Sequence, residues 1–452
     1  MAQTAVTRPI QGGFLVHHPQ QPIAWHRGKA LCAEHFLQDV SRLAAQLPES
    51  HHVFNLCEDR YHFLVSFAAA ILRNQITLMP SNSTPGAVNT LLQDRPDSYC
   101  LCDQEIPGIQ APQYLFETLI QGNQAAIPLP REIPRKQRVA VLFTSGSTGK
   151  PKPNPKTWGE LQCEADSALR HFPFLARGIS SIVATVPSQH MYGLATSVLF
   201  PWQGGLAVHT GRPLFPADIA SDLALTSAPR VLITTPLHLR ACLDSDVIWP
   251  DIDFVISATA PLSQELAAEA EHQMRTEIYE IYGSTETGSI ASRRTVQEQT
   301  WHLYDGIRID IEDGSAVAQG GHLFSPIHLN DHIRSLDQHS FLLQGRATDM
   351  LKIAGKRVSL GDLNQKLLAI PEVVDGVFVP PADPTTETRR LTALVVAPAL
   401  GKQDILSALA QSVDAAFLPR PLYFVDKLPR NDTGKLPRDA LIQLLKSLKK
   451  TP

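Results

Sequence analysis

The chain has 452 residues, of which 43% are hydrophobic and 19% are charged, and its formal net charge is −4. A chain of this length exceeds what one hydrophobic core usually supports, so at least two domains are expected. This balance is typical of an ordinary globular protein and gives no sign of a nucleic-acid partner, which would favour a strongly basic face.

The N-terminal part of the chain contains no sequence typical of membrane insertion. Its longest apolar run, Phe63 to Leu72, is about half the length of a membrane-spanning helix. No basic start and small-residue cleavage site accompany it, so neither a signal peptide nor an integral membrane segment is expected. The six cysteines are scattered without the spacing of a zinc site. We therefore expect a cytoplasmic protein with reduced thiols.

Buried strands alternate with helices along most of the chain. Continuous apolar or β-branched segments predict strands at Arg138–Thr144, Ser180–Val186, Arg230–Thr234 and Phe254–Ser257. Helices are predicted between them, for example at Ala217–Leu225 and Ser263–Met274. The alternation favours an α/β sheet with helices on its faces. Short strands separated by turn residues follow from Tyr304 to Asp337, which predicts a small β-rich subdomain. A new α+β pattern begins at about Asp349.

The stretch LFTSGSTGKPKPNPKTW, from Leu142 to Trp158, joins a predicted strand to a loop of small and hydroxylated residues. Such a loop lets backbone N–H groups converge on anionic oxygens. It is not a GxxxxGK[ST] loop, because Thr144 stands where the first glycine is required and Pro151 follows Lys150. It is not a GxSxG nucleophile turn either, since position 145 is serine. A solvated polar loop is the alternative.

Further motifs follow this loop in chain order. They are PSQHMYG (187–193), SATAPLS (257–263), IYGSTETG (281–288), Asp331, the pair Gly345-Arg346, and LPRNDTGKLPR (428–438). Together with TSGSTGKPK (144–152), the series resembles the adenylate-forming superfamily, which includes acyl- and aryl-CoA synthetases, adenylation domains and luciferases. The matches span most of the chain. The resemblance implies a large N-terminal domain with an acyl pocket, residues 1–347, and a small mobile C-terminal domain, residues 348–452.

The resemblance implies an ATP-dependent ligase (AMP-forming) that activates a carboxylic acid. The acid attacks the α-phosphate of ATP, acyl-AMP forms and pyrophosphate leaves, so proximity and electrostatic stabilisation matter most. Transfer of the acyl group to a phosphopantetheine thiol follows. The implied cofactors are ATP, Mg²⁺, and either coenzyme A or the phosphopantetheine of an acyl carrier protein.

The same resemblance assigns roles to individual residues. The loop residues expected to hold the departing phosphates are Thr144, Ser145, Gly146, Ser147, Thr148, Gly149 and Lys152. Thr285 is expected at the α-phosphate and Glu286 at Mg²⁺, because a hard cation prefers carboxylate oxygen. Asp331 suits the ribose hydroxyls, and Arg346 the ribose-phosphate side. Lys435 is expected to neutralise the reacting carboxylate and α-phosphate oxygens together.

The expected acyl and nucleotide pocket is less distinctive. His190 is placed by the resemblance near the carboxylate and the thiol channel, with a core or surface histidine as the alternative. Aromatic walls for the acyl pocket and adenine site are expected from Tyr192, Tyr282 and Trp202, which are also consistent with ordinary core aromatics. The remaining pocket residues are Gly283 and the pair Ala258-Thr259, which replaces the family's Gly-Gly and adds volume to the pocket floor.

The C-terminal domain of the family rearranges about a hinge between the two half-reactions. Here the hinge position is Thr348, where the family has aspartate or lysine, and Gly355 matches a glycine that lets a pantetheine arm pass. Two other departures are Asn364, in place of a glutamate, and the stiff Pro153-Asn154-Pro155 segment after the loop. This indicates a compact, divergent branch.

We expect the substrate to be a small aryl acid, with a short or medium fatty acid as the alternative. Coenzyme A and an acyl carrier protein supply the same thiol, and the sequence does not separate them. The basic run Lys446 to Lys450 is either part of a carrier-docking face or a solvated tail. The alternative to an enzyme is a non-catalytic nucleotide-binding homologue. Such a protein has no need of the catalytic lysine, so Lys435 argues against it.

Overall fold

The computed structural model describes residues 14–145, 151–172, 180–312, 315–346, 350–353, 356–380, 391–431 and 434–448. Its internal contacts divide the chain into two units, one of Met1–Arg308 with Ala318–Ile327 and one of Ile309–Val317 with His328–Pro452. The domain boundary predicted after Ala347 lies outside the described residues and stays a prediction.

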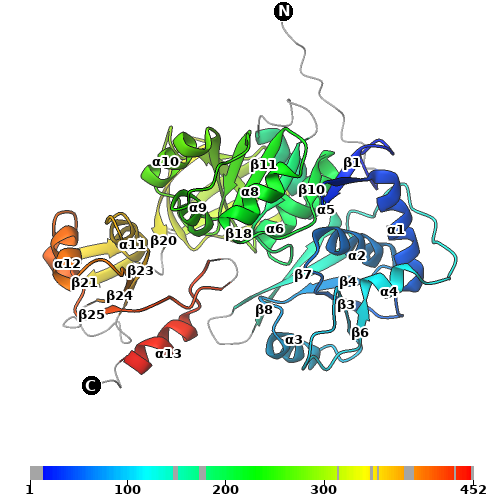
Figure 1. Ribbon diagram of the computed structural model, residues 1–452, viewed down its shortest axis with the longest axis horizontal. Coiled ribbons are helices and arrows are strands. Elements are labelled where there is room, and N and C mark those ends of the chain that lie inside the picture. Colours follow the sequence, from blue (N-terminus) through cyan, green and yellow to red (C-terminus); the bar gives the residue numbers. More distant parts are fainter. Residues whose placement is uncertain are drawn as a thin grey trace, which may run out of the picture. The chain divides into compact units, whose positions relative to one another are not determined.

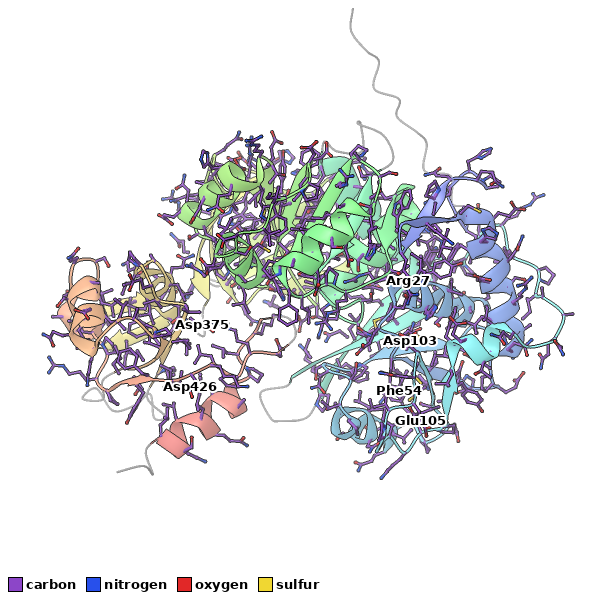
Figure 2. All side chains as sticks on the ribbon, in the orientation of Figure 1. Arg27, Phe54, Asp103, Glu105, Asp375 and Asp426 are labelled. Carbon is purple, nitrogen blue, oxygen red and sulfur yellow. The ribbon has the colours of Figure 1, made fainter. Side chains whose placement is uncertain are left out.

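A six-stranded sheet in the described part of the first unit carries the predicted phosphate loop. Its strand order is β6 (Gln113–Leu115), β5 (Tyr99–Cys102), β3 (His52–Asn55), β4 (Ile76–Met79), β7 (Arg138–Ser145) and β8 (Pro151–Thr157). All neighbouring pairs run parallel except β7 and β8, which form an antiparallel hairpin. Phe54, labelled in Figure 2, packs in its core with Leu78 and with Val88 of helix α3 (Pro85–Leu92).

The apolar run that begins at Phe63 lies in helix α2 (Arg60–Leu72), and residues 63–71 are buried. Asp59 caps the helix by accepting hydrogen bonds from the backbone N–H groups of Tyr61 and His62. The helix packs beside α1 (Ala33–Gln46). Its apolar surface is therefore covered by protein, and no helix among the described residues is long and apolar enough to cross a membrane.

Strand β8 is the proline-rich segment for which the sequence predicted only stiffness. It lies at the end of the strand order, paired on one side with β7, with Thr144 opposite Lys152 and Ser145 opposite Pro151. Prolines occupy every second position, so their missing N–H groups all fall on one side of the strand. An edge strand tolerates this because it needs donors on one side only. The alternation places Lys152, Asn154 and Lys156 on one face.

A second, larger sheet follows in the first unit. Within this unit its strand order is β15 (Trp301–Leu303), β14 (Gly288–Arg294), β13 (Glu277–Ser284), β12 (Phe254–Ser257), β11 (Arg230–Thr234), β9 (Ser181–Ala184), β10 (Ala207–His209), β1 (Pro22–His26) and β2 (Lys29–Cys32). Strands from β13 to β1 run parallel, and the ends of the sheet are antiparallel. Figure 1 shows the N-terminal β1, in blue, beside β10.

Helices cover this second sheet as the alternation predicted. Helices α8 (Pro216–Ala224), α9 (Pro236–Leu243) and α10 (Gln264–Met274) share one apolar cluster with β9, β11, β12 and β13. The strands β11 and β12 have the predicted bounds. Helix α8 begins and ends one residue earlier than predicted, and α10 begins one residue later. The other helices among the described residues of the unit are α4 (Phe116–Ile120), α5 (Trp158–His171), α6 (Met191–Leu194), the π-helix η2 (Ala195–Leu199) and α7 (Phe200–Gly204).

The predicted β-rich segment forms β16 (Ile307–Glu312), β17 (Ser315–Gly320) and β18 (Leu323–His328), which pair as a three-stranded sheet in the described residues. In the second unit, β19 (Asp331–Ser335) pairs with β20 (Ser340–Arg346), and β21 (Met350–Ile353) pairs with β22 (Lys356–Ser359). A sheet of β23 (Asp375–Val379), β24 (Thr392–Val396) and β25 (Leu422–Phe424) follows.

The second unit has cores of its own. One apolar cluster joins β23 and β24 to helices α11 (Leu360–Leu368) and α12 (Lys402–Ala410), with a short 3₁₀ turn η4 (Ala415–Phe417). A second cluster joins the same strands to helix α13 (Arg438–Leu448) through Leu441. Because successive side chains of a strand point to opposite faces, helices cover both sides of this small sheet. The unit thus has the predicted α+β character.

Candidate functional site

The predicted site residues of the first unit follow the carboxyl ends of neighbouring parallel strands. Residues 187–193 come after β9, Ala258 and Thr259 come directly after β12, and Thr285 and Glu286 come directly after β13. Carboxyl ends of parallel strands share one edge of a sheet, where ligands of open α/β sheets bind. The topology therefore gathers motifs that lie up to about a hundred residues apart in sequence at one edge.

The turn from β13 to β14 is built by its own side chains. Ser284 N–H donates to Thr287 Oγ1 at 2.9 Å, and Thr287 N–H donates to Ser284 Oγ at 3.2 Å. A Cβ at Gly283 would lie 2.0 Å from the carbonyl oxygen of Gly288, so only glycine fits this approach. The turn thereby presents Thr285 and Glu286 from a fixed backbone.

Glu286 contacts the β7–β8 hairpin. Lys152 Nζ lies 3.4 Å from Glu286 Oε1, and the two side chains are 63% and 31% exposed. Partial burial would raise the pKa of Glu286, but its own backbone N–H and the Lys152 ammonium outweigh burial and lower the pKa below its usual value. The structure thus brings the predicted phosphate-binding lysine beside the predicted metal ligand, and this carboxylate is ionised at neutral pH.

Two buried ionisable residues hold the same turn, and sequence reasoning named neither. Lys156 on β8 donates to the carbonyl oxygen of Glu286 at 2.7 Å. Glu164 on α5 accepts from the N–H of Ser289 at 2.7 Å and from its hydroxyl at 3.0 Å. Both side chains are buried, and a Cβ at Gly288 would lie 2.3 Å from a carboxylate oxygen of Glu164. The segment β8–α5 therefore binds the turn at two places, Glu286 and Ser289.

The start of the phosphate loop is fixed from β8 as well. Asn154 is buried, and its side-chain amide donates to Thr144 Oγ1 and to the carbonyl oxygen of Leu142, each at 3.3 Å. Thr144 is thus held where the loop leaves β7. For Ser145 the structure describes the backbone, which pairs opposite Pro151. Gly146, Ser147, Thr148 and Gly149 lie outside the described residues.

His190 stands at the N-cap of α6, where its backbone N–H donates to the carbonyl oxygen of Pro187. A Cβ at Gly193 would lie 2.0 Å from that same carbonyl oxygen, which explains the glycine of this motif. Tyr192 donates its hydroxyl to the carbonyl oxygen of Ile256 at 2.8 Å, at the end of β12. The following π-helical turn is of a kind that is frequent at functional sites.

A fully buried arginine positions this motif. Arg60 donates to Ser188 Oγ at 3.1 Å, to Ser197 Oγ at 2.7 Å and to the carbonyl oxygen of Ala184 at 2.6 Å. Burial and the neighbouring Arg212 lower the pKa of Arg60 to about 9. The guanidinium ties the end of β9 to the π-helical turn.

The predicted pocket residues have different surroundings. Thr259 has φ of 79°, a left-handed conformation that a β-branched residue rarely adopts and that the family's glycine adopts without strain. Ala258 beside it is buried. Tyr282 packs its ring against Trp301, with ring centroids 5.5 Å apart. These positions lie at the same strand ends as Thr285.

Trp202 is fully buried, and its indole N–H donates to the carbonyl oxygen of Phe14. Its ring contacts those of Phe14, Phe36, Phe67 and Trp158. An indole enclosed by aromatic side chains and paired through its only donor is a packing residue. These surroundings favour the core alternative that the sequence left open.

The second unit carries the remaining predicted residues. Asp331 at the start of β19 pairs opposite Arg346 at the end of β20, so the two positions are cross-strand neighbours. For Arg346 the structure describes the backbone only. Thr348 and Gly355 lie outside the described residues, and their roles stay predictions.

Lys435 lies in an ordered turn in front of α13, and its side chain is exposed. Its backbone N–H donates to Asn431 Oδ1 at 2.9 Å. Arg430 makes a two-pronged pair with Asp375 of β23, with both N···O distances 2.7 Å, and donates to the carbonyl oxygen of Gly434 at 2.6 Å. Asp375 is labelled in Figure 2. The predicted catalytic lysine is therefore anchored through its backbone.

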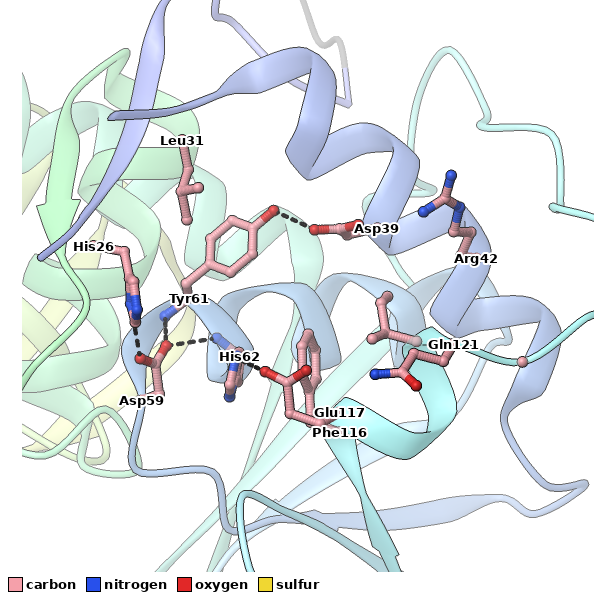
Figure 3. Close-up of a pocket in the computed structure, with 12 residues that line it drawn as sticks. His26, Leu31, Asp39, Arg42, Asp59, Tyr61, His62, Phe116, Glu117 and Gln121 are labelled. Carbon is pink, nitrogen blue, oxygen red and sulfur yellow. Dashed lines mark hydrogen bonds and ion pairs between the residues drawn. The ribbon is translucent and has the colours of Figure 1, made fainter. Parts of the chain in front are cut away.

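A separate cavity of about 600 Å³ lies among β1, α1, α2 and α4, and none of the predicted site residues lines it. Figure 3 shows its polar lining: Tyr61 donates to Asp39, and His62 lies against Glu117. His62 also pairs with Asp103 at 2.7 Å and stacks on Phe116. These contacts pair Tyr61 and His62 of the lining with acidic side chains.

The chain matches the family model described as "AMP-binding enzyme" over residues 17–314, and it therefore belongs to that family. A 4-coumarate–CoA ligase of Rhodobacter capsulatus is 31% identical over 300 residues, covering 66% of this chain and 74% of the relative. A fatty acid–[acyl-carrier-protein] ligase of Streptomyces coeruleorubidus is 23% identical, covering 94% and 93%.

Solved structures show the same fold. An O-succinylbenzoate coenzyme A synthetase from Bacillus subtilis, in complex with ATP and magnesium ion, aligns with a TM-score of 0.79 at 16% identity, covering 93% of this chain and 96% of that one. The mixed α/β architecture with a smaller C-terminal domain, and membership of the adenylate-forming superfamily, are confirmed.

Proposed function

We propose that this protein is an AMP-forming acid–thiol ligase, which activates a small aryl acid with ATP and passes the acyl group to a phosphopantetheine thiol. The observation that carries the proposal is the pairing of Lys152 with Glu286 at 3.4 Å, which joins the phosphate-loop hairpin to the acidic turn. The family match and the named activities of the relatives support it.

The first half-reaction joins two anions. A carboxylate oxygen of the acid attacks the α-phosphorus, an O–P bond forms, the bond to the bridging oxygen breaks, and pyrophosphate leaves. The Thr144–Lys152 segment binds the leaving phosphates, and Lys152 offsets their charge. Thr285 contacts the α-phosphate, and Tyr282 borders the adenine. Asp331 binds the ribose, with Arg346 beside it, and Lys435 neutralises the reacting oxygens.

Glu286 has the properties of a single-carboxylate magnesium ligand. It is ionised and 31% exposed, and no cluster of three or more acidic, histidine or cysteine side chains suited to a metal occurs in the described residues. This donor set fits Mg²⁺, which is commonly held by one or two carboxylates together with substrate phosphates and water. When bound, the ion neutralises phosphate charge.

The second half-reaction uses the acyl-AMP. The thiol sulfur attacks the acyl carbon, a C–S bond forms, the bond from the acyl carbon to the phosphate oxygen breaks, and AMP leaves. His190 and Gly355 border the thiol path in this proposal, and rearrangement about Thr348 exchanges the two active arrangements. The acceptor is coenzyme A or an acyl carrier protein, and the relatives include ligases of both kinds.

The residues at the strand ends favour a small, flat acid. Ala258 and Thr259 each carry a Cβ where the resembled pattern has glycine, and Ala258 is buried. Tyr192, the predicted aromatic wall of this pocket, is held by its hydrogen bond to the carbonyl oxygen of Ile256 near the end of β12. A short or medium fatty acid is the second candidate, supported by the fatty acid ligase relative.

Acid-dependent exchange of pyrophosphate into ATP, measured across a panel of aryl and fatty acids, tests the proposal. We expect exchange with at least one aryl acid, and its loss in Lys435→Ala with ATP binding retained. Lys446→Ala, at another lysine of the same unit, is the matched control and should leave exchange unchanged. Absence of exchange with every acid, despite measurable ATP binding, would favour a non-catalytic nucleotide-binding protein.

A further inference from the structure

Lys156 is a buried lysine in a position that the reaction itself does not explain. Its side chain lies on β8, on the same face as Lys152 and Asn154, and only 6% of the residue is exposed. Burying an ammonium is costly unless its charge and its donors are satisfied. It donates a hydrogen bond to the backbone carbonyl of Glu286 at 2.7 Å, a residue 130 positions further along the chain.

The acidic turn is held from both sides by one continuous segment. Lys156 binds the turn at Glu286, and Glu164, two turns into helix α5, binds it at Ser289 through both the backbone N–H and the hydroxyl. Thr157 and Glu160 cap the start of α5 directly after β8, so the helix follows the strand without a connecting loop. His322 adds a third contact to this turn, with its Nε2 2.8 Å from the carbonyl oxygen of Thr287.

This arrangement separates two roles for the lysines of β8. Lys152 is 63% exposed and contacts the carboxylate of Glu286, so it is available to a ligand. Lys156 is buried and binds the backbone carbonyl of that residue, so it affects the orientation of the Glu286 carboxylate. Groups that orient a metal ligand without touching the metal commonly affect metal affinity.

We propose that Lys156 is a positioning residue for the divalent cation: with Glu164 it locks the Ser284–Ser289 turn so that the Glu286 carboxylate faces the nucleotide phosphates. The inference rests on the proposed function, in which Glu286 binds the cation. Loss of the Lys156 hydrogen bond frees the carbonyl of Glu286 and lets the carboxylate adopt other orientations. Cation binding then weakens, whereas binding of the metal-free nucleotide and of the acid does not.

The test measures binding and turnover separately in the full chain. Mn²⁺ affinity in the presence of ATP is followed by electron paramagnetic resonance, and the Mg²⁺ dependence of pyrophosphate exchange is measured alongside. Lys156→Met should weaken Mn²⁺ binding by about tenfold or more, the range for lost second-layer partners of a metal ligand. The Mg²⁺ concentration for half-maximal exchange should rise in proportion, with the KM for the acid unchanged.

Three further variants keep the inference falsifiable. Lys156→Arg retains a buried cationic donor and should restore most of the Mn²⁺ affinity. Glu164→Gln keeps the packing but weakens the contact with Ser289, so it should weaken Mn²⁺ binding to a smaller degree. It replaces Lys156→Met if that variant does not fold. Lys136→Met, at an exposed lysine just before β7, is the matched control and should behave as the wild type.

The outcomes distinguish this inference from the function on which it rests. If the wild type shows no acid-dependent exchange at all, the proposed ligase function fails. If the wild type exchanges and both Lys156→Met and Glu164→Gln bind Mn²⁺ as the wild type does, the positioning role is overturned while the ligase function stands.

Discussion

At the scale of single residues, Thr259 combines an uncommon backbone conformation with a place at the expected pocket floor. Its φ of 79° disfavours every residue with a Cβ, and a β-branched one most of all. Strain of this kind persists where the surroundings over-determine the backbone, and it is concentrated at functional sites.

This strain predicts an inverted order of stability at position 259. Thr259→Gly should be more stable than Thr259→Ala by about 1 kcal/mol, because only glycine adopts positive φ without steric cost. Urea unfolding of the two variants measures the difference. At position 258 the ordinary order is expected, with the wild-type alanine more stable than Ala258→Gly. Equal stability of the two variants at position 259 would contradict the strain.

His62 gives a second prediction at this scale. Burial would lower its pKa, but the hydrogen bond to Asp103 and the carboxylates of Asp59 and Glu117 outweigh burial and raise it. A raised pKa means that the folded state binds the proton more tightly. The stabilisation is therefore complete below the unfolded pKa, about 6.5, and is lost as pH rises through the folded pKa.

The expected result is a pH-dependent difference between the wild type and His62→Gln. The free energy of unfolding of the wild type should exceed that of the variant by the largest amount near pH 6. This difference should shrink as the pH rises towards 9. Denaturant unfolding across this range measures it. His18→Gln, at an exposed histidine, serves as the control, and a constant excess across the range would refute the assignment.

At the scale of elements, the sequence predicted the buried strands well and the edge strand poorly. Strands such as Arg230–Thr234 are short, continuous runs of β-branched and apolar residues, a pattern typical of strands buried on both faces. Strand β8 carries three prolines, which local rules assign to loops. Its strand character depends on pairing with β7, which no local rule includes. The alternation of proline with Lys152, Asn154 and Lys156 was the available signal.

The candidate site divides in a similar way. Residues within family motifs, such as Lys152 and Glu286, were predicted from the sequence, and the structure places these two in contact. The groups that hold the motifs were missed. Lys156, Glu164 and Arg60 are charged residues, which sequence rules assign to the surface, and their burial depends on partners more than a hundred positions away.

The turn in front of α13 yields a prediction at the same scale. Asp375→Asn should reduce acid-dependent exchange while ATP binding is retained, because Arg430 loses its charged partner and no longer fixes the turn that carries Lys435. The cost in stability should be about 2 kcal/mol, typical of leaving a partly buried charged donor unsatisfied. Asp362→Asn, which breaks an exposed pair on α11, is the control. Unchanged exchange in Asp375→Asn would show that the pair does not position the lysine.

At the scale of the whole molecule, each of the two units has apolar clusters made of its own residues. The first unit contains an apolar cluster under α8, α9 and α10, and the second contains clusters around β23 and β24. Units with independent cores commonly unfold as separate cooperative transitions. The family match, over residues 17–314, falls almost entirely within the first unit.

Calorimetry should therefore resolve two unfolding transitions. Glu280→Gln leaves Arg293 without its buried partner and should lower only the transition of the first unit, by about 3 kcal/mol. Asp375→Asn should lower only the transition of the second unit. A single transition that both variants shift equally would show that the units unfold as one.

The prolines of β8 have a consequence beyond the chemistry of the site. The outer side of this strand lacks N–H donors at Pro151, Pro153 and Pro155, so it offers no ladder to which a strand from another molecule can add. An open sheet edge is otherwise a place where strands of two molecules can pair at high protein concentration. The same alternation that places Lys152, Asn154 and Lys156 on one face of β8 thus keeps the edge of the sheet unable to recruit further strands.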